Sequence, residues 1–432
     1  MYYTELKNLG KSLFGIDANN THSGNIAISA SNDNFYITSS GSMKWDLKKE
    51  QIVKLKLSKL SKNDKIASVE TPIHRAIIKE TKSKISLHTH QINAINISLD
   101  SKNKKYFLSK HSKNSDNLFD YIYKPKDVFG KAIFGDIIVS EFKNSFAASC
   151  EMVKRIPLYL QDRKITIVQG HGPFFRAISA KNAFNLAATL EDSTLSTILM
   201  SRYGIHRFNL KHSISLKNSV IGKKVTTSKE FEYWANYNYK SRCGANGSMS
   251  KKISKTKFIF SDTSSSPTCY FPKLKEFSID FDKGDSTLIK IHKLIYQNCK
   301  KTHCIINSSP MITTLGSFIL FKSSNCEKTL SGETEASGFI KPIDVESIAL
   351  YPKFGVLGIS VLKSLDKNSP LLEMLKNCSG CCVVSSFGLI TYGNSFEECE
   401  HSITSAKRCA TFINNLFINK KIIGKNQGFK GN

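Results

Sequence analysis

Two histidines one residue apart, His88 and His90, are the residues of this chain whose spacing best suits chemistry. They follow the segment Ser83–Leu87, whose composition predicts the end of a β-strand. Alternate side chains of a strand point to the same face, so both imidazoles would aim at one point, as two ligands of one metal ion must. The alternative interpretation is a pair of histidines on a solvated strand.

A third histidine favours the metal interpretation. His171 follows the apolar segment Ile165–Val168, which predicts another strand. Three imidazoles leave a tetrahedral or five-coordinate metal ion with an open position, which is typical of a catalytic rather than a structural site. Upstream of the pair, Glu70 precedes Ile73–Lys79, where apolar residues recur at helical spacing.

Several motifs, in this order, resemble the class II (metal-dependent) aldolase/adducin family over roughly residues 1–210. No single motif is specific, and the ordered set carries the resemblance. The segments are Thr21–Ser29, similar to the family's first phosphate loop and following strand; Ile37–Gly41, similar to its second loop; Ser68–His74, around the catalytic Glu; and His88–His90 with Gly170–Gly172, around the ligands.

The resemblance implies a three-layer α/β/α fold with a central, mostly antiparallel sheet. It implies a divalent metal, which we expect to be Zn²⁺, on His88, His90 and His171, with Glu70 as general acid and base. Val69 stands where the family often has a second serine, so one phosphate donor is missing. The implied phosphate-binding residues are Gly24, Asn25, Thr38, Ser39, Ser40, Gly41 and Ser68.

The reaction implied by the resemblance is cleavage or formation of a carbon–carbon bond in a sugar phosphate or related ketose. The partner would be a small phosphorylated sugar or aldehyde. Sugar-phosphate epimerases are close alternatives, although they tend to have Asp at the position of Glu70. Dehydratases and decarboxylases of the family, and a non-catalytic adducin-like binding protein, also remain alternatives.

The net charge of +27 invites a nucleic-acid interpretation, but the kind of basic residue argues against it. Only eight of the 62 basic residues are arginine, the side chain suited to bidentate phosphate and base contacts. The lysines are scattered rather than clustered. We therefore expect no nucleic-acid partner, while a basic field would still attract a phosphorylated substrate.

The sequence predicts neither a membrane-spanning segment nor a secretion signal. No apolar run approaches the length of a membrane span, and the first residues lack a signal pattern, so we expect a cytoplasmic protein. The 11 cysteines are then expected to be reduced core thiols. Cys378, Cys381 and Cys382 resemble half of a zinc site, but no second Cys-x-x-Cys completes it.

The elements that must position these residues can be predicted along the first half. We expect a helix over residues 3–16, a hairpin, and a strand over Ile92–Leu99, followed by a polar surface insertion through Asp116. Helices are expected over Phe142–Leu158 and Ala180–Ser201. The predicted domains are residues 1–210, with the metal site, and 230–432, joined by a linker over 211–229.

The second half reads as an imperfect repeat of the first. Lys257–Ser266 resembles Asn34–Ser42, Ile291–Tyr296 resembles Ile73–Ile78, and Cys382–Leu389 resembles Ile165–Pro173. The expected metal ligands are replaced. Asn307, Ser309 and Phe387 stand at the three histidine positions, and Leu288 lies near the counterpart of Glu70. We expect a degenerate copy of the fold without metal.

The resemblance also implies rings of four subunits in which a neighbour supplies a tyrosine as acid. A chain with two such domains would form this ring as a homodimer, a pseudo-tetramer. Tyr351 stands about where that tyrosine falls, and a phenol is a reasonable proton donor to a departing alkoxide. Tyr121 and Tyr123 are the competing candidates.

Overall fold

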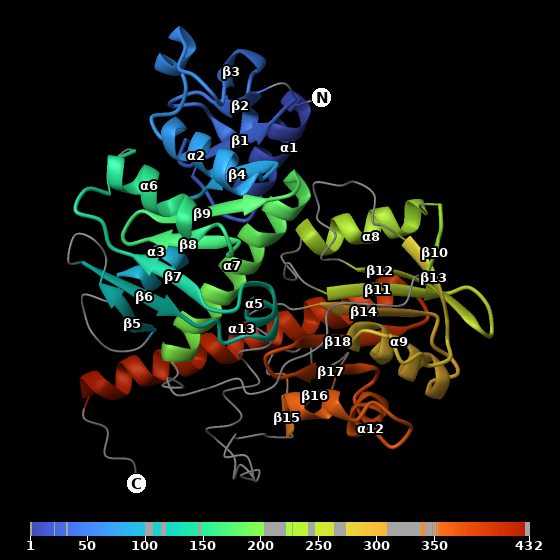
Figure 1. Ribbon diagram of the computed structural model, residues 1–432. Helices are drawn as coiled ribbons and strands as arrows, with labels where there is room; N and C mark the ends of the chain where they lie inside the picture. Colours follow the sequence, from blue (N-terminus) through green and yellow to red (C-terminus); the bar gives the residue numbers. More distant parts are fainter. Residues whose placement is uncertain are drawn as a thin grey trace. The chain divides into compact units, whose positions relative to one another are not determined.

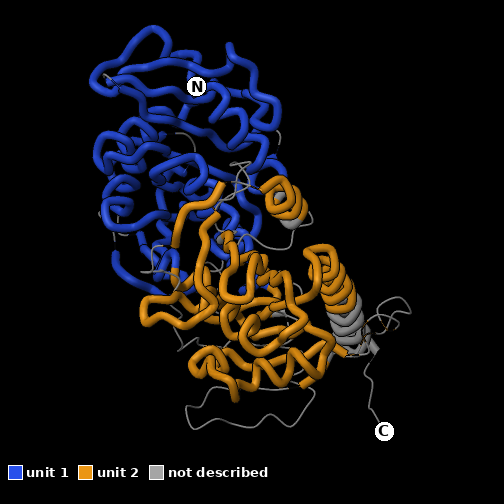
Figure 2. The backbone as a smooth tube through the Cα atoms, turned by 90° about the vertical axis from the view of Figure 1, so that its right-hand side faces the viewer, with its two compact units in different colours: residues 1–125, 133–198, 265–269 blue, residues 126–132, 199–264, 270–432 orange. Residues whose placement is uncertain are grey.

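The computed structural model describes residues 2–20, 22–31, 33–99, 107–113, 118–145, 148–202, 222–226, 228–240, 247–262, 274–308, 338–340, 342, 348, 351 and 353–427. Figure 2 shows two compact units. Unit 1 holds residues 1–125, 133–198 and 265–269, and unit 2 holds 126–132, 199–264 and 270–432.

Unit 1 is built on a nine-stranded sheet in the spatial order β3-β2-β1-β4-β9-β8-β7-β6-β5 (Figure 1). Every neighbouring pair is antiparallel except β7 and β8. The strands are β1 (Asn25–Ser29), β2 (Asn34–Thr38), β3 (Ile52–Lys56), β4 (Ile85–His88), β5 (Leu108–Lys113), β6 (Phe119–Tyr123), β7 (Ile137–Ser140), β8 (Ile165–Val168) and β9 (Gly172–Ala177).

Helices cover both faces of this sheet. Asp120 and Tyr123, three residues apart on β6, must point to opposite faces. Asp120 contacts Arg155 of α6, whereas Tyr123 contacts Thr197 of α7. The helices of the first half are α1 (Tyr2–Gly15), α2 (Thr71–Thr81), α3 (Ile92–Ser98), α5 (Val128–Phe134), α6 (Cys150–Tyr159) and α7 (Ala180–Arg202), with short 3₁₀ helices η1 (Lys44–Asp46), η2 (Lys49–Gln51) and η3 (Lys62–Lys65). The predicted α/β/α layering is therefore confirmed.

The predicted surface insertion contains the exposed edge strand β5. Two local predictions in the first half were wrong. Ile92–Leu99 is not a strand, because helix α3 buries Ala94, Ile97 and Ser98 at helical spacing and leaves Ile92 exposed. The helix expected from Phe142 begins only at Cys150, where the Ser149 hydroxyl caps the Met152 N–H.

Unit 2 contains a second nine-stranded sheet, in the order β10-β13-β12-β11-β14-β18-β17-β16-β15. Its strands are β10 (Lys223–Lys224), β11 (Gly247–Lys252), β12 (Lys257–Asp262), β13 (Leu274–Ser278), β14 (Cys304–Ser308), β15 (Gly338–Ile340), β16 (Phe354–Leu357), β17 (Cys381–Val384) and β18 (Gly388–Gly393). Its helices are α8 (Lys229–Lys240), α9 (Thr287–Asn298), η4 (Ile359–Lys363), α12 (Pro370–Asn377) and α13 (Phe396–Gln427).

The two sheets share one topology. From β13 to β15, the second sheet repeats the order and pairing direction of the first from β3 to β6, including its one parallel pair, β16 with β17. The chain thus contains the mixed α/β architecture twice, as the predicted fold class requires. Within the predicted linker 211–229, Lys223 and Lys224 form edge strand β10; residues 211–221 and 227 lie outside the described part of the chain.

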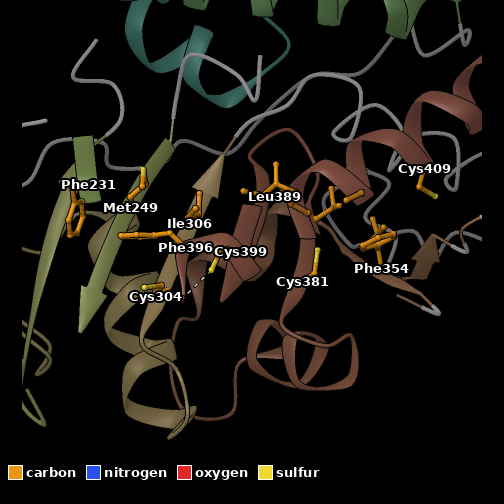
Figure 3. Packing of buried hydrophobic residues seen from close by; sticks show 14 of the residues in the cluster. Phe231, Met249, Cys304, Ile306, Phe354, Cys381, Leu389, Phe396, Cys399 and Cys409 are labelled. Atoms are coloured by element: carbon orange, nitrogen blue, oxygen red, sulfur yellow. Dashed lines mark hydrogen bonds between the residues drawn. The ribbon is translucent and has the colours of Figure 1, made fainter. Parts of the chain in front are cut away.

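The core of unit 2 is rich in sulfur as well as aromatic rings (Figure 3). Phe231 packs edge-to-face against Phe396, and the Cys399 thiol donates to the Cys304 carbonyl over 3.5 Å. Burial raises the pKa of Cys304 to about 12, so this thiol stays protonated. The cysteines in the described part of the chain are all free, and all but Cys150 are buried, as expected for reduced core thiols. None of the described helices has the length and hydropathy that a bilayer span requires.

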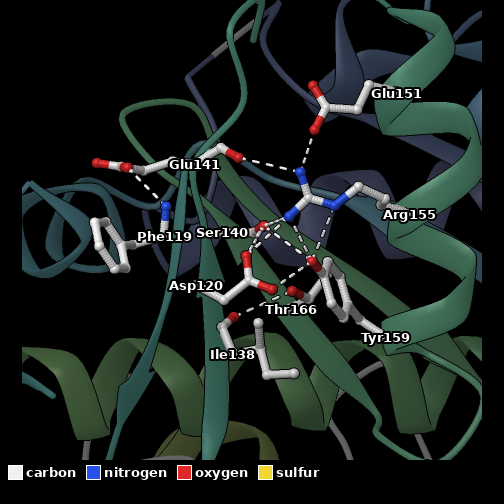
Figure 4. Close-up of polar contacts among 9 residues, drawn as sticks. All are labelled: Phe119, Asp120, Ile138, Ser140, Glu141, Glu151, Arg155, Tyr159 and Thr166. Carbon is white, nitrogen blue, oxygen red and sulfur yellow. Dashed lines mark hydrogen bonds and ion pairs between the residues drawn. The ribbon is translucent and has the colours of Figure 1, made fainter. Parts of the chain in front are cut away.

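A buried polar network fixes α6 to the sheet of unit 1 (Figure 4). The Arg155 guanidinium donates to Asp120 over 2.8 Å and to the Ser140 hydroxyl over 2.7 Å, while the Tyr159 hydroxyl donates to Asp120 over 2.6 Å. Glu151 contacts the outer edge of the same guanidinium. The Asp120 carboxylate is nearly buried, so it depends on Arg155 for its neutralisation.

We predict that Arg155→Met destabilises unit 1 by roughly 3 to 5 kcal/mol, because it leaves the Asp120 carboxylate buried without its partner. Denaturant unfolding measures the change. Arg163→Met is the matched control, since Arg163 pairs with the exposed Asp162 and should change stability by less than about 1 kcal/mol. Equal effects of the two substitutions would contradict the role assigned to the network.

Glu400 of α13 makes stability depend on pH. Burial raises the pKa of Glu400 from 4.5 to about 8, and neither carboxyl oxygen has a hydrogen-bond partner. The folded protein therefore keeps a proton that the unfolded chain releases above pH 4.5. Stability should fall between these two pH values by up to about 1.4 kcal/mol per unit.

Glu400→Gln should remove this part of the pH dependence, because the amide carries no proton to lose. Thermal unfolding at pH 5 and pH 8 checks the prediction: the variant should lose less stability between the two conditions than the parent. Glu397→Gln, on the exposed side of the same helix, is the control. A parent protein whose melting temperature does not fall over this range would contradict the assignment.

Candidate metal centre

Three histidines from two connections of unit 1 meet at one point. His88 ends β4, His90 follows in the loop before α3, and His171 lies in the turn between β8 and β9. Their ligand nitrogens lie within 4.8 Å of one another. Gly172 permits this approach, because its φ is +145° and a Cβ there would collide with the Thr89 carbonyl. The structure thus brings together the three histidines that the sequence singled out.

The hydrogen bond of His88 leaves its Nε2 free to bind a metal ion. Its Nδ1–H donates to the Pro173 carbonyl over 3.0 Å, so Nε2 carries the lone pair, and Nε2 is buried without a hydrogen-bond partner. Such a carbonyl partner is the usual support of a metal-binding imidazole. Burial also lowers the pKa of His88 well below its ordinary value, lowers that of His171 to about 4, and lowers that of His90. The three rings are therefore neutral at pH 7, the form that binds metal.

Glu70 lies against this cluster at the start of α2. Its carboxyl oxygens are 3.6 Å from His88 Nε2 and 3.4 Å from His171 Nε2. Burial raises the pKa of Glu70 to about 7, although the Asn25 hydrogen bond and the Lys44 charge oppose the shift. A carboxyl group with a pKa near 7 can both accept and donate a proton at neutral pH.

Asn25 orients Glu70 through a chain that sequence reasoning missed. The Asn25 Nδ2 donates to Glu70 over 2.6 Å, and its Oδ1 accepts from Nε2 of His74. Burial lowers the pKa of His74 to about 3, and the Ser86 hydroxyl lies 2.7 Å from its Nδ1. A signal was present in the sequence, because His74 lies one helical turn after Glu70, on the apolar face of α2.

The His90 loop is held from two sides. The His90 N–H donates to the Asn19 side chain over 2.9 Å. The next residue, Gln91, donates to the Ala187 carbonyl and the Glu191 carboxyl of α7, over 2.8 and 3.2 Å. Neither Asn19 nor Glu191 was singled out from the sequence, because their contacts join segments far apart in the chain. Their effect is to fix the backbone that carries the second histidine.

The predicted phosphate residues line the strand ends beside Glu70. Ser68 Oγ accepts from Asn25 Nδ2 over 3.0 Å, and Thr38 Oγ1 accepts from the Ile26 N–H over 3.3 Å. Ser39 forms an isolated bridge with Ala67, and the Ser40 N–H donates to the Ile66 carbonyl.

Two glycines of the predicted phosphate set adopt positive φ, +70° at Gly24 and +65° at Gly41, but their surroundings differ. Gly24 packs against Asn19 and the His88 carbonyl, while the Cβ direction of Gly41 is open. Val69 is 64% exposed. The phosphate-binding role of the whole set stays a prediction.

The candidate tyrosines occupy separate environments. Tyr351 belongs to unit 2, where its hydroxyl lies 2.7 Å from Ser402 Oγ and its ring stacks on Phe354. Burial raises its pKa above 10. Tyr123 is fully buried, and its hydroxyl donates to the Ser193 carbonyl. Tyr121 is nearly buried on the same strand. The role of Tyr351 as an acid stays a prediction.

Strand register identifies the equivalent positions of unit 2. Asn307 pairs with Ser248 of β11 and Ile390 of β18, as His88 pairs with Asn25 and Phe174. Phe387 occupies the turn between β17 and β18, as His171 does between β8 and β9. Ser309 lies outside the described residues, and Leu288 is buried in α9. Amide and phenyl groups at these positions are poor ligands for a divalent transition metal.

Comparison with known proteins identifies the first half. Residues 4–196 match the model of the Class II Aldolase and Adducin N-terminal domain. No curated protein matches the chain.

Solved structures similar to the chain include L-fuculose-1-phosphate aldolase from Thermus thermophilus, with 21% identity over 48% of this chain and 98% of that one, and a TM-score of 0.40. YgbL from Escherichia coli, described as a putative aldolase/epimerase/decarboxylase, is 16% identical over 46% and 89%, with a TM-score of 0.39. On the match to the family model, residues 4–196 of this chain belong to the class II aldolase and adducin family.

Proposed function

We propose that the first half of this chain is a zinc-dependent aldolase that cleaves or forms a carbon–carbon bond in a sugar phosphate or related ketose. One observation carries the proposal: a buried carboxyl group whose pKa is raised to about 7 contacts two of three clustered, neutral imidazoles. Proton transfer beside an electrophilic metal is the chemistry that such a group can perform.

The donor set fits a divalent metal. Three neutral nitrogen ligands that leave a position open suit Zn²⁺. His88, His90 and His171 would hold the ion, which supplies Lewis acidity toward a substrate carbonyl oxygen when bound. Three buried atoms around this point have no hydrogen-bond partner, namely Glu70 Oε1, His88 Nε2 and His171 Nδ1. Each unsatisfied group costs about 1 to 3 kcal/mol, which is hard to explain in a purely structural domain.

Glu70 would carry the proton between its carboxyl group and the carbon beside the substrate carbonyl. Asn25 holds the carboxyl oxygen nearer His88, so the other oxygen stays directed at His171. The burial that raises the pKa of Glu70 also excludes water, which keeps the proton available for the substrate. Burial of His88 prevents its protonation at neutral pH, so the ligand set stays intact there.

Other reactions of the family use similar parts. A sugar-phosphate epimerase, a dehydratase or a decarboxylase would also need a proton carrier beside a metal. Glu rather than Asp at position 70 favours cleavage over epimerisation. An adducin-like binding protein needs neither the histidines nor the carboxyl group, so the unpartnered buried atoms favour an enzyme.

The proposal includes a phosphorylated substrate and a ring-shaped homodimer. The basic charge of the chain favours an anionic sugar or aldehyde phosphate, held by the loops at Gly24–Asn25 and Thr38–Gly41 with Ser68. Two domains of one topology in one chain suit a homodimer that builds a ring of four domains. In this ring Tyr351 of a neighbouring domain would be the acid.

The purified protein should contain one zinc ion per chain, and the double variant His88→Ala with His90→Ala should lose it, because one imidazole cannot retain the ion. Elemental analysis measures the content. His111→Ala, an exposed histidine of β5, is the control and should keep the ion. Two ions per chain, or zinc retained in the double variant, would exclude this centre as the sole site.

Glu70→Gln should keep the metal and lower turnover about 100- to 10,000-fold, because the nearly isosteric amide cannot accept a proton at neutral pH. Release of aldehyde from a panel of ketose phosphates is the assay, and it also separates cleavage from epimerisation. Glu80→Gln, at the exposed end of the same helix, is the control. Unimpaired turnover in Glu70→Gln would remove Glu70 from the mechanism.

A further inference from the structure

Lys44 is a buried ammonium group between the two loops that precede and follow the β1–β2 hairpin. Lys44 is the first residue of the short helix η1, and only 2% of its surface is exposed. The Nζ donates to the His22 carbonyl over 2.7 Å and to the Ser42 carbonyl over 2.8 Å. These two acceptors belong to the segments before Gly24 and after Gly41. The two loops thus hold one cation between them.

The charge of Lys44 is not neutralised by an ion pair. Among the described residues, no carboxylate lies within 4.0 Å of its Nζ, and no third acceptor is found for the ammonium group, which has three donors. By contrast, Lys293 in unit 2, the other lysine that is buried in the described part of the chain, donates to both oxygens of Asp285, over 3.0 and 2.8 Å. A buried ammonium with two carbonyl acceptors and no counter-ion is expensive to maintain.

Electrostatic effects show which groups this ammonium faces. Apart from burial, the influence acting on the pKa of His90 is the positive charge of Lys44, which lowers it. The same charge opposes the rise in the pKa of Glu70. Burial lowers the pKa of Lys44 itself to about 8, so the group is still mostly charged at pH 7. The Glu70 charge in turn acts to raise the pKa of Lys44, so the two groups face each other beside the candidate metal centre, although no ion pair joins them among the described residues.

Two arginines of unit 1 that are buried or partly buried have different partners. Arg75 contacts Asp64 and the Lys56 carbonyl, and Arg155 belongs to the network with Asp120. The neutral donor Asn25 Nδ2 is shared by Ser68 and Glu70. In the second loop, the Cβ direction of the exposed Gly41 is open.

We propose that Lys44 is the charged donor that binds the phosphoryl group of the substrate. The inference rests on the proposed function for the substrate class, but the anion site itself can be tested without turnover. The two carbonyls orient the ammonium group, and its third N–H and its charge are left for a phosphoryl oxygen. An anion here would supply the missing counter-ion and would partly replace the serine donor that Val69 lacks.

The test is isothermal titration of the full-length, zinc-loaded protein with inorganic phosphate. Lys44→Met keeps the length of the side chain and removes the charge, and it should weaken phosphate binding about 10- to 100-fold, as loss of a charge-assisted hydrogen bond does. Lys84→Met is the matched control, because Lys84 is a partly buried lysine that also donates to a carbonyl, that of Ser29, and should bind phosphate like the parent. Acetate is titrated in parallel to separate a phosphoryl site from a carboxylate site.

The outcomes separate this inference from the proposed function. Unchanged phosphate affinity in Lys44→Met, no phosphate binding by the parent, or acetate binding in preference to phosphate would each overturn it, whether or not the protein is an aldolase. Phosphate binding that depends on Lys44, without cleavage of any ketose phosphate, would support it and overturn the proposed function instead.

Folding is monitored by thermal unfolding and by zinc content. If Lys44→Met fails to fold, Lys44→Gln retains an amide donor for the two carbonyls without the charge, and the same loss of phosphate affinity is expected.

Discussion

The burial of Glu70 is the constraint on which the candidate centre depends. A carboxyl group placed in water has a pKa near 4.3 and is a weak base at pH 7. Here it sits at the start of α2, under the ends of β1 and β4, where burial raises its pKa to about 7. Asn25 and the His74–Ser86 chain prevent it from turning toward solvent. A pKa suited to proton transfer at neutral pH thus follows from packing.

Burial, rather than ion pairing, sets the charge states of the groups around Glu70. The three imidazoles are neutral because they are buried, and the carboxyl group is near its midpoint for the same reason. Lys44 is therefore opposed only by the partly ionised Glu70, with which it forms no ion pair among the described residues. An anion beside Lys44 would improve this balance, because a buried ammonium group without an ion pair is costly.

The two units carry different residues on one sheet topology. In unit 2 the helix equivalent to α2 keeps a buried histidine, His292, which contacts Ser248 and Ser250. The positions of His88 and His171, however, carry Asn307 and Phe387. The sheet order depends on backbone pairing and on apolar side chains, so it survives substitutions that remove every ligand.

Sequence patterns alone determined the main elements and the histidines of the candidate centre in the first half. Alternation in β1 and β2, the apolar stripes of α1, α2 and α7, and the histidine spacing are local properties, so they can be read without coordinates. Local patterns failed where burial decided the outcome: the isoleucines of α3 suggested a strand, and only packing against β8 and β9 shows a helix. Only the tertiary structure could show that His74, Asn25 and Glu70 form one chain, or that Lys44 lacks a counter-ion. Those properties depend on distances between segments far apart in sequence and on exclusion of water, which no local pattern records.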